Sequence, residues 1–313
     1  MTLTELRYIV AVATERHFGR AAEKCYVSQP TLSVAVKKLE DELGVPLFER
    51  GPGEVTVTPV GRRVIEQAQR VLEEASAIKH IAEAGKDELA GPLRVGAIYT
   101  VGPYLMPQLI VQMRRRAPRM PLIIHESYTS ALGDMLKRGE VDVIILSLPY
   151  AHPGIVTQAV YDEPFRVVVP ASHAWASKTR VPTADLCREN LLLLSAGNCF
   201  RDQVLQLCTG ARRDTDDSMQ RNLEGGSLET IRQMVASGVG ITVLPSTAAE
   251  APLLDRRLLA IRPLSPGTPT RRVALAWRRS FPRRRAIETL RQSILACRLA
   301  GVTLLPEAAE TAD

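Results

Sequence analysis

The sequence lacks any apolar run that approaches the roughly 18 residues of a membrane-spanning helix. Its N-terminus also lacks the basic stretch, apolar core and small-residue cleavage site of a signal peptide. The five cysteines are an odd number without repeated spacing, and neither a CxxC pair nor a Cys/His zinc pattern occurs. These absences predict a cytoplasmic protein of a reducing compartment, with no membrane partner and with no metal or other cofactor.

The net charge of +6 is weak evidence for nucleic-acid binding, because the basic residues are unevenly distributed. Residues 1–63 hold nearly equal numbers of basic and acidic side chains, and the excess comes late in the chain. The late basic residues include Arg271, Arg272, Arg278, Arg279 and the triplet 283–285. A solvated basic face accounts for them. The 313 residues suffice for two or three domains, each with its own core.

The N-terminal segment predicts three helices. Apolar residues recur at helical spacing over residues 4–15, and a short helix follows at about 18–24. Ser28 is a good N-cap for a third helix, which ends at Gly44. The residues of this helix predicted to point inward are Leu32, Val36, Leu39 and Leu43. A short helix, a tight turn and a longer helix form the helix-turn-helix arrangement.

The outward face of the third helix carries short polar and apolar groups that can enter the major groove of DNA, and a lysine that can bind phosphate. Residues 50–58 contain Gly/Pro turn residues followed by strict alternation, which predicts a β-hairpin wing. An arginine at its start can reach phosphate or the minor groove. The predicted DNA-binding residues are Ser28, Gln29, Pro30, Thr31, Ser33, Lys37 and Arg50. The alternative is a three-helix packing unit that binds no nucleic acid.

The same segment resembles a known family. It combines Ala21-Ala22, Val27-Ser28-Gln29-Pro30-Thr31-Leu32-Ser33, Lys38-Leu39-Glu40, Leu43-Gly44 and Leu47-Phe48-Glu49-Arg50. Their order and spacing resemble the signature of LysR-type transcriptional regulators. The resemblance implies a winged helix-turn-helix, a linker helix and an effector domain, assembled as a homodimer or homotetramer on double-stranded DNA.

A long helix is predicted from about Pro59 to Asp87 independently of the resemblance. Its apolar residues alternate between spacings of four and three, at Val64, Ala68, Val71, Ala75, Ile78 and Ala82. This a/d pattern favours pairing with a second copy of the same helix. The alternative is a helix packed on its own domain.

The remainder of the chain predicts alternating strands and helices, which is typical of a parallel α/β sheet. The predicted strands are 93–98, 121–126, 141–146, 165–169, 191–194, 240–244 and 272–277, and the predicted helices are 103–117, 131–138, 228–237 and 283–299. Crossings near 162–165 and 265–270 resemble the two-lobed, periplasmic-binding-protein-like effector domain of the family. The predicted domains are the DNA-binding domain 1–58, the linker helix and hinge 59–90 and the effector domain 91–305, with lobe I at about 91–162 and 270–305 and lobe II at about 163–269.

Two cysteines enclose a further segment that is predicted to be helical. Asn198 can cap it, which puts Cys199 in the first turn, where free backbone N–H groups and the helix dipole favour a thiolate. Arg201 can add a positive charge. Nine residues of helix would separate the Cα atoms of Cys199 and Cys208 by roughly 13 Å, whereas a disulfide needs about 4.4–6.8 Å. A disulfide would therefore require the helix to unwind; the alternative is two unrelated buried thiols.

Within the LysR family, four motifs resemble the hydrogen-peroxide sensors of the OxyR group. They are Gly-x-Cys-Phe-Arg-Asp-Gln at 197–203 followed by Cys208, Thr-Val-Gly-Pro-Tyr-Leu at 100–105, Ser-Leu-Glu-Thr at 227–230 and Ile-Thr-Val-Leu-Pro at 241–245. The resemblance implies that Cys199 is the peroxidatic cysteine and Cys208 the resolving one, with Thr100, Thr129, Asn198, Arg201 and Arg272 around the peroxide. It implies partners as well: hydrogen peroxide, RNA polymerase (contacted near Asp142) and a thiol–disulfide reductant. Cys25, Cys187 and Cys297 are interpreted as structural.

The chain departs from the family pattern at one position, because Asn198 stands where the family commonly has His. An amide can orient peroxide but cannot supply a positive charge or relay protons. Two rival functions remain open. One is a LysR-type regulator controlled by a small metabolite in the interlobe cleft. The other is an enzyme, a thiol peroxidase or Cys/His hydrolase using His125 or His173, although neither lies in a nucleophile–base pattern; we predict that the protein is not an enzyme.

Overall fold

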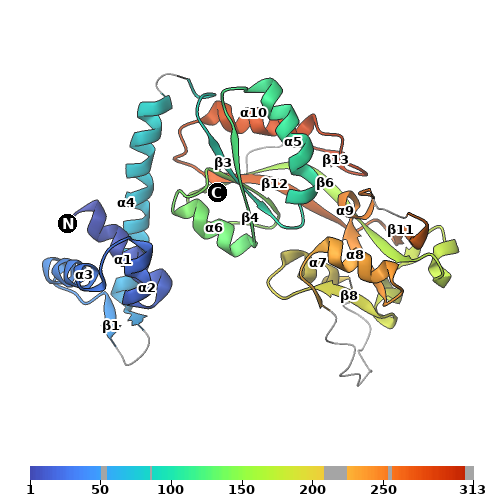
Figure 1. The fold of residues 1–313 in the computed structure, drawn as a ribbon, viewed down its shortest axis with the longest axis horizontal. Helices are drawn as coiled ribbons and strands as arrows, with labels where there is room; N and C mark the ends of the chain where they lie inside the picture. The colour runs from blue at the N-terminus through green and yellow to red at the C-terminus, as the bar shows by residue number, and fades with distance from the viewer. Residues whose placement is uncertain (51–54, 85–86, 208–223, 253–255, 307–313) are drawn as a thin grey trace. The chain divides into compact units, whose positions relative to one another are not determined.

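The computed structural model describes residues 1–50, 55–84, 87–207, 224–252 and 256–306 (Figure 1). By its contacts the chain divides into two compact units. The first unit comprises Met1–Lys86 with the short segment Lys137–Glu140, and the second comprises Asp87–Leu136 with Val141–Asp313.

The first unit is the predicted winged helix-turn-helix followed by a long helix. Its elements are α1 (Leu3–Glu15), α2 (Phe18–Lys24), α3 (Gln29–Leu43), β1 (Phe48–Arg50), β2 (Val55–Val57) and α4 (Pro59–Ala84). The Ser28 hydroxyl caps α3 by accepting a hydrogen bond from the Thr31 amide, and Gly44 ends the helix with a φ of 69°. Leu32, Val36 and Leu39 are fully buried, as predicted. The prediction for Leu43 was wrong: it is 37% exposed, because it lies in the last turn of the helix.

Helix α4 packs on its own domain along its first half. Ile65 and Ala68 belong to the core of the first unit, and Val64, Val71 and Leu72 pack against that core. Beyond this point Ile78 is 68% exposed. The alternative of a helix packed on its own domain is therefore confirmed for the first half, and pairing with a second copy stays a prediction. The beginning is held by its own domain, and the later part exposes an apolar position of the predicted pairing pattern.

The second unit is an α/β structure built on one extended sheet (Figure 1). Its strands are β3 (Leu93–Ile98), β4 (Leu122–Ser127), β5 (Val143–Ser147), β6 (Ile155–Pro170), β7 (Val181–Pro182), β8 (Leu191–Leu194), β9 (Glu224–Gly225), β10 (Ile241–Pro245), β11 (Leu259–Ser265), β12 (Thr270–Arg278) and β13 (Thr303–Leu304). Its α-helices are α5 (Gly102–Arg116), α6 (Thr129–Lys137), α7 (Cys199–Gln206), α8 (Leu228–Ala236), α9 (Ser246–Ala249) and α10 (Arg284–Leu295), with short 3-10 turns at Ala174–Ser177, Thr183–Arg188 and Arg256–Leu258.

The sheet is mixed, which corrects the prediction of a parallel sheet. Strands β4, β3 and β5 run parallel, and β10, β8 and β9 do likewise. Between these two sets, β12 and β6 pair in antiparallel fashion. Residues Ile155–Pro164 of β6 pair with β12, whereas Phe165–Pro170 pair with β10 and β11. One continuous strand is thus shared by both parallel sets.

Two hydrophobic cores flank this shared strand. One core is formed by β3, α5, β4, α6, β5, β12 and α10, which we call lobe I, and the other by β8, α7, α8, β10 and β11, which we call lobe II. The predicted two-lobed fold class is confirmed. Among the described residues, no helix has the length and apolar character needed to cross a membrane.

Candidate functional site

Cys199 is the first residue of α7 in lobe II. Asn198 occupies the N-cap position, as predicted, but its side chain does not cap the helix. It is buried, and its Nδ2 donates to the Ser195 carbonyl at 3.2 Å. Cys199 is half-buried and packs against the core of lobe I. Cys208 lies outside the described residues.

Thr129 contacts the sulfur of Cys199 from the opposite lobe. It begins α6 directly after the turn that follows β4. Its Oγ1 donates to Cys199 Sγ at 3.6 Å. A hydroxyl in this position stabilises a negatively charged sulfur more than a neutral thiol. Two predicted site residues, far apart in the sequence, are therefore brought together by the fold.

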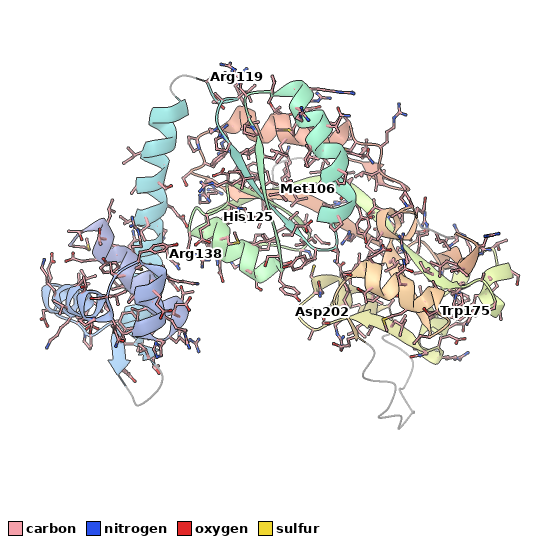
Figure 2. The ribbon with its side chains drawn as sticks, viewed as in Figure 1. Met106, Arg119, His125, Arg138, Trp175 and Asp202 are labelled. Carbon is pink, nitrogen blue, oxygen red and sulfur yellow. The ribbon has the colours of Figure 1, made fainter. Side chains whose placement is uncertain are left out.

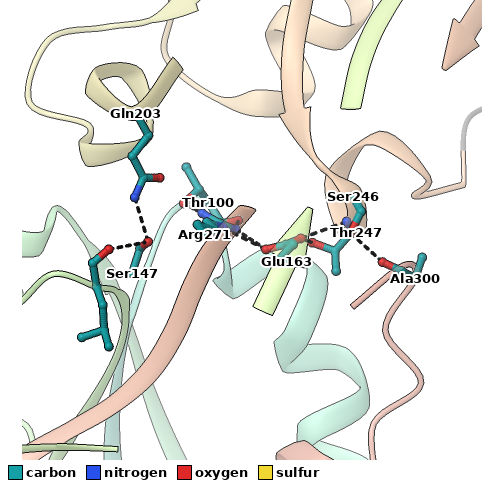
Figure 3. A network of polar contacts seen from close by, with 9 residues as sticks. Thr100, Ser147, Glu163, Gln203, Ser246, Thr247, Arg271 and Ala300 are labelled. Carbon is teal, nitrogen blue, oxygen red and sulfur yellow. Dashed lines mark hydrogen bonds and ion pairs between the residues drawn. The ribbon is translucent and has the colours of Figure 1, made fainter. Parts of the chain in front are cut away.

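Gln203 makes a second contact between α7 and lobe I that sequence reasoning missed. Its Nε2 donates to the Ser147 Oγ at 3.0 Å, at the end of β5 (Figure 3). Its Oε1 is buried and has no hydrogen-bond partner. Gln203 follows Cys199 by four positions, which places both on one helix face. That spacing was the available signal.

Thr100 belongs to a buried ionic network between β6 and β12 (Figure 3). Arg271 donates from Nη1 to the Thr100 hydroxyl at 2.7 Å and from Nη2 to the Thr100 carbonyl at 2.9 Å. The same guanidinium pairs with Glu163, whose other oxygen accepts from the Thr247 amide and hydroxyl. The arginine that reaches Thr100 is therefore Arg271, which was not among the predicted site residues.

Arg272 and Arg201 have other partners. Arg272 is exposed and forms a two-pronged ion pair with Asp162, at 2.7 and 2.9 Å, which raises the pKa of the guanidinium. Arg201 donates to the Leu194 carbonyl at 2.7 Å and pairs with Glu224 at 2.6 Å. The Glu224 carboxylate offsets the positive charge that Arg201 was expected to bring to Cys199.

The predicted DNA-binding face of α3 is open to solvent. Ser28, Gln29, Pro30, Thr31 and Lys37 are exposed, and Ser33 is half-buried. The side chain of Arg50 lies outside the described residues. This face presents hydroxyl, amide and ammonium groups on the second helix of the motif. Such groups form hydrogen bonds with the base edges and phosphates of DNA.

Asp142, Cys25 and Cys297 have surroundings that fit a structural role, and the same interpretation of Cys187 stays a prediction. Asp142 is buried and accepts from both the backbone amide and the guanidinium of Arg94, so it serves the fold of lobe I. Cys297 is buried and donates to the Ser293 carbonyl. Burial raises the pKa of the Cys25 thiol and raises that of Cys297 to about 11. Such thiols are poor nucleophiles at neutral pH.

Neither predicted histidine is placed as a general base for Cys199. His125 lies within β4 in lobe I (Figure 2). His173 accepts from the Trp175 amide and lies 3.6 Å from Glu189 in lobe II. Within the described part of the chain, no group of three or more His, Cys, Asp or Glu residues is arranged to hold a metal ion.

Comparison with known families matches both units. A model described as a bacterial regulatory helix-turn-helix protein of the lysR family matches residues 3–62, and one described as a LysR substrate binding domain matches residues 86–297. The chain belongs to the LysR family. The second match spans most of the α/β unit, which carries Cys199, Thr129 and Thr100.

Several relatives of this LysR regulator carry names that refer to peroxide. A hydrogen peroxide-inducible genes activator of Dickeya chrysanthemi is 40% identical over 94% of this chain and 95% of that protein. The DNA-binding transcriptional dual regulator OxyR of Escherichia coli K12 is 40% identical over 95% of each chain. The family and its OxyR branch, both predicted from the sequence, are confirmed.

Solved structures similar to this chain also belong to OxyR proteins. A full-length OxyR from Pseudomonas aeruginosa, with its cysteine replaced by aspartate, is 53% identical, covers 96% of this chain and 99% of its own, and superposes with a TM-score of 0.73. A hydrogen-peroxide-bound OxyR mutant from Corynebacterium glutamicum is 33% identical over 94% of this chain and 91% of its own, with a TM-score of 0.61.

Proposed function

We propose that this LysR regulator senses hydrogen peroxide through oxidation of Cys199 and formation of a Cys199–Cys208 disulfide. The observation that carries the proposal is the hydrogen bond from the Thr129 hydroxyl to the Cys199 sulfur, at the N-terminus of α7. The hydroxyl and the free amides of the first helical turn both favour a thiolate at this position. Relatives named hydrogen peroxide-inducible genes activator support it.

The chemistry requires no cofactor. The Cys199 thiolate attacks one oxygen of hydrogen peroxide, the O–O bond breaks, and hydroxide leaves and is protonated to water. The Cys208 thiolate then attacks the sulfenic sulfur, an S–S bond forms, and a second water leaves. An external dithiol reduces the disulfide by exchange and is itself oxidised. Each oxidation consumes one peroxide per site. We propose that the oxidised protein then acts as a signal and does not serve as a peroxidase with repeated turnover.

We propose that this chemistry changes the fold of α7. Helix α7 ends at Gln206, two residues before Cys208. A helix continued to Cys208 would hold the two Cα atoms roughly 13 Å apart, too far for a disulfide at about 4.4–6.8 Å. Bond formation therefore unwinds α7. The Thr129–Cys199 and Gln203–Ser147 hydrogen bonds, which connect α7 to lobe I, are lost in the process.

The output is a change in how several copies of the chain engage DNA. The α3 face binds the major groove, and the exposed apolar residues Ile110 and Val111 of α5 and Ile123 of β4 provide a surface for self-association in lobe I. We include RNA polymerase and a thiol–disulfide reductant as partners, because activation and reset require them. A regulator of chromosomal DNA acts in the cytoplasm.

Thiol counting with peptide mapping tests the proposal. The full-length protein is treated with one equivalent of hydrogen peroxide as wild type, as Cys208→Ser and as Cys199→Ser. A Cys199–Cys208 bridge in the wild type and a sulfenic acid at Cys199 in Cys208→Ser are expected. A wild-type Cys199 that stays reduced would refute the sensor.

A second candidate, control by a small metabolite, is favoured by one observation. A cavity of about 930 Å³ is lined by Gln203 of α7 together with Tyr150, His152, Thr270 and Arg272. Because Gln203 lies on the cysteine helix, an occupant would act on the same element. The Cys199→Ser variant distinguishes the two candidates. A metabolite sensor keeps its regulation of DNA binding in this variant, whereas a peroxide sensor loses it.

Asn198 gives a further test of how the cysteine is activated. Its buried amide donates to a backbone carbonyl and supplies no charge to the thiolate. We expect Asn198→His to raise the rate of Cys199 oxidation at neutral pH, because an imidazolium stabilises a neighbouring anion. Asn198→Gln is the control. Equal oxidation rates in the wild type and Asn198→His would mean that hydroxyl and helix N-terminus suffice.

A further inference from the structure

Two tyrosines stand directly before the two threonines of the site. Tyr99 follows β3 and precedes Thr100, and Tyr128 follows β4 and precedes Thr129. Their rings form an edge-to-face pair, with centroids 5.3 Å apart and an interplanar angle of 81°. Both remain partly open to solvent, at 41% and 38% exposure. The pair therefore lies at the surface, at the ends of the strands that deliver Thr100 and Thr129.

Tyr128 also lies against the loop that leads into α7. Gly197 has a φ of 92°, a conformation that L side chains rarely adopt, and a Cβ built there would be 4.0 Å from two carbons of the Tyr128 ring. The ring therefore lies near the loop two residues before Cys199, on the side to which a Gly197 Cβ would point. On its other side, Thr129 reaches the Cys199 sulfur at 3.6 Å. Tyr128 is thus a partly exposed ring placed next to two neighbours of Cys199, Thr129 and the Gly197 loop.

We propose that Tyr99 and Tyr128 form an aromatic gate that restricts the oxidant of Cys199 to hydrogen peroxide and excludes bulkier alkyl hydroperoxides. The inference rests on the proposed oxidation of Cys199 and assigns its substrate specificity. Hydrogen peroxide is close to water in size and passes beside the rings. A tertiary-alkyl group must displace a ring that is held by its edge-to-face partner and by the loop at Gly197.

The chemistry is the same for both oxidants. The thiolate sulfur attacks the outer oxygen of ROOH, the S–O bond forms as the O–O bond breaks, and RO⁻ leaves and takes a proton to become water or an alcohol. Only the group R differs. A difference in rate between the two oxidants therefore reports access to the sulfur, whereas a change in thiolate reactivity alters both rates together.

The test compares tert-butyl hydroperoxide with hydrogen peroxide on the full-length Cys208→Ser protein, in which oxidation stops at the sulfenic acid. The rate of Cys199 sulfenate formation is followed by dimedone trapping and peptide mass spectrometry. Added to this background, Tyr128→Ala and Tyr99→Ala should each raise the ratio of the two rate constants, alkyl over hydrogen peroxide, by about tenfold. Tyr128→Phe, which keeps the ring, should leave the ratio unchanged. Tyr26→Ala removes an exposed tyrosine of the other unit and is the control.

The outcomes are distinct. A raised ratio in both alanine variants, with Tyr128→Phe and Tyr26→Ala unchanged, supports the gate. An unchanged ratio, with or without a parallel change of both rates, overturns it and leaves the peroxide sensor standing. If neither oxidant modifies Cys199 in the Cys208→Ser parent, the proposed function falls and the gate with it. Thermal unfolding of each variant identifies misfolding, and the two independent alanine variants keep the test decisive if one of them does not fold.

Discussion

Arg271 of β12 and Glu163 of β6 form an ion pair in which both side chains are fully buried, with Nη2 and Oε2 2.7 Å apart. The remaining hydrogen-bonding capacity is used by Thr100 on the arginine side and Thr247 on the glutamate side. A buried pair is tolerated when its charges are satisfied in this way. Thr100 is one of the proposed peroxide-site residues. The buried pair therefore contacts the proposed site through the hydrogen bonds from Arg271 to Thr100.

Glu163→Gln should lower the free energy of unfolding by about 3–5 kcal/mol, since it leaves the Arg271 charge buried without a counter-charge. Asp162→Asn is the matched control. It breaks the neighbouring but exposed pair with Arg272, for which a loss of about 1 kcal/mol or less is expected. Urea denaturation of the reduced protein measures both. Similar losses for the two variants would mean that burial of the Arg271–Glu163 pair has no special energetic weight.

Thr129→Val should slow oxidation of Cys199 by hydrogen peroxide about tenfold, because a hydrogen bond to a charged group contributes about 1.5–3 kcal/mol. Valine keeps the shape of threonine but removes the donor at 3.6 Å from the sulfur. Thr129→Ser keeps the donor and should oxidise at nearly the wild-type rate. The rate of sulfenate trapping in a Cys208→Ser background gives the comparison. If valine and serine behaved alike, the hydroxyl would have no part in activating the thiol.

Lys37→Ala should weaken DNA binding and reduce the magnitude of the slope of log K against log salt by about 0.9, the loss of one phosphate contact. Lys38 is the matched control, since its ammonium pairs with Glu5 at 3.4 Å. Fluorescence anisotropy with any labelled duplex, titrated at several salt concentrations, measures the slope. A slope change in Lys38→Ala and none in Lys37→Ala would place the phosphate contact on the other side of α3.

Cys297 should resist alkylation while Cys199 reacts. Burial raises the pKa of Cys297 to about 11 from 9.0, so at pH 8 roughly one molecule in a thousand carries the thiolate there. An acid with a raised pKa stays neutral up to a higher pH. Labelling of Cys297 should therefore increase only as the pH approaches 11. Iodoacetamide labelling with peptide mapping, in native protein and in urea, checks this. Rapid native labelling of Cys297 at pH 8 would contradict the burial.

The predicted helices of the first unit needed only local information. The bounds of α3 follow from Ser28, whose hydroxyl caps it, and Gly44, whose positive φ ends it. Both signals lie within the segment itself. The first half of β6 was missed because its polar residues, Thr157, Gln158, Asp162 and Glu163, do not alternate regularly with apolar ones, and Pro164 interrupts the segment. Its partner in this region, β12, comes more than a hundred residues later in the sequence.

The sequence predicted which residues to consider for the proposed site, but not which of them contact one another. Cys199 and Thr100 lie in motifs and Thr129 was implied by the family resemblance, but successive residues of a strand point to opposite faces. Arg271 and Arg272 of β12 therefore cannot both reach Thr100. Composition gives no reason to choose between them, because the choice depends on which face of β12 lies on the side of the Thr100 turn between β3 and α5. Gln203 was also missed, since its partner Ser147 is distant in the chain.

Strand β6 has a consequence for protein engineering. Since it continues unbroken from Ile155 to Pro170 and pairs with both halves of the sheet, the lobe that carries Cys199 does not end where its core ends. A fragment that begins at Phe165 would start in the middle of β6 and expose a sheet edge. Glu163 would remain on the other fragment. Lobe II, which carries Cys199, therefore cannot be transferred to another protein on its own. A chimaeric sensor must inherit the whole of β6 together with its partner β12, so that Glu163 and Arg271 stay in one molecule.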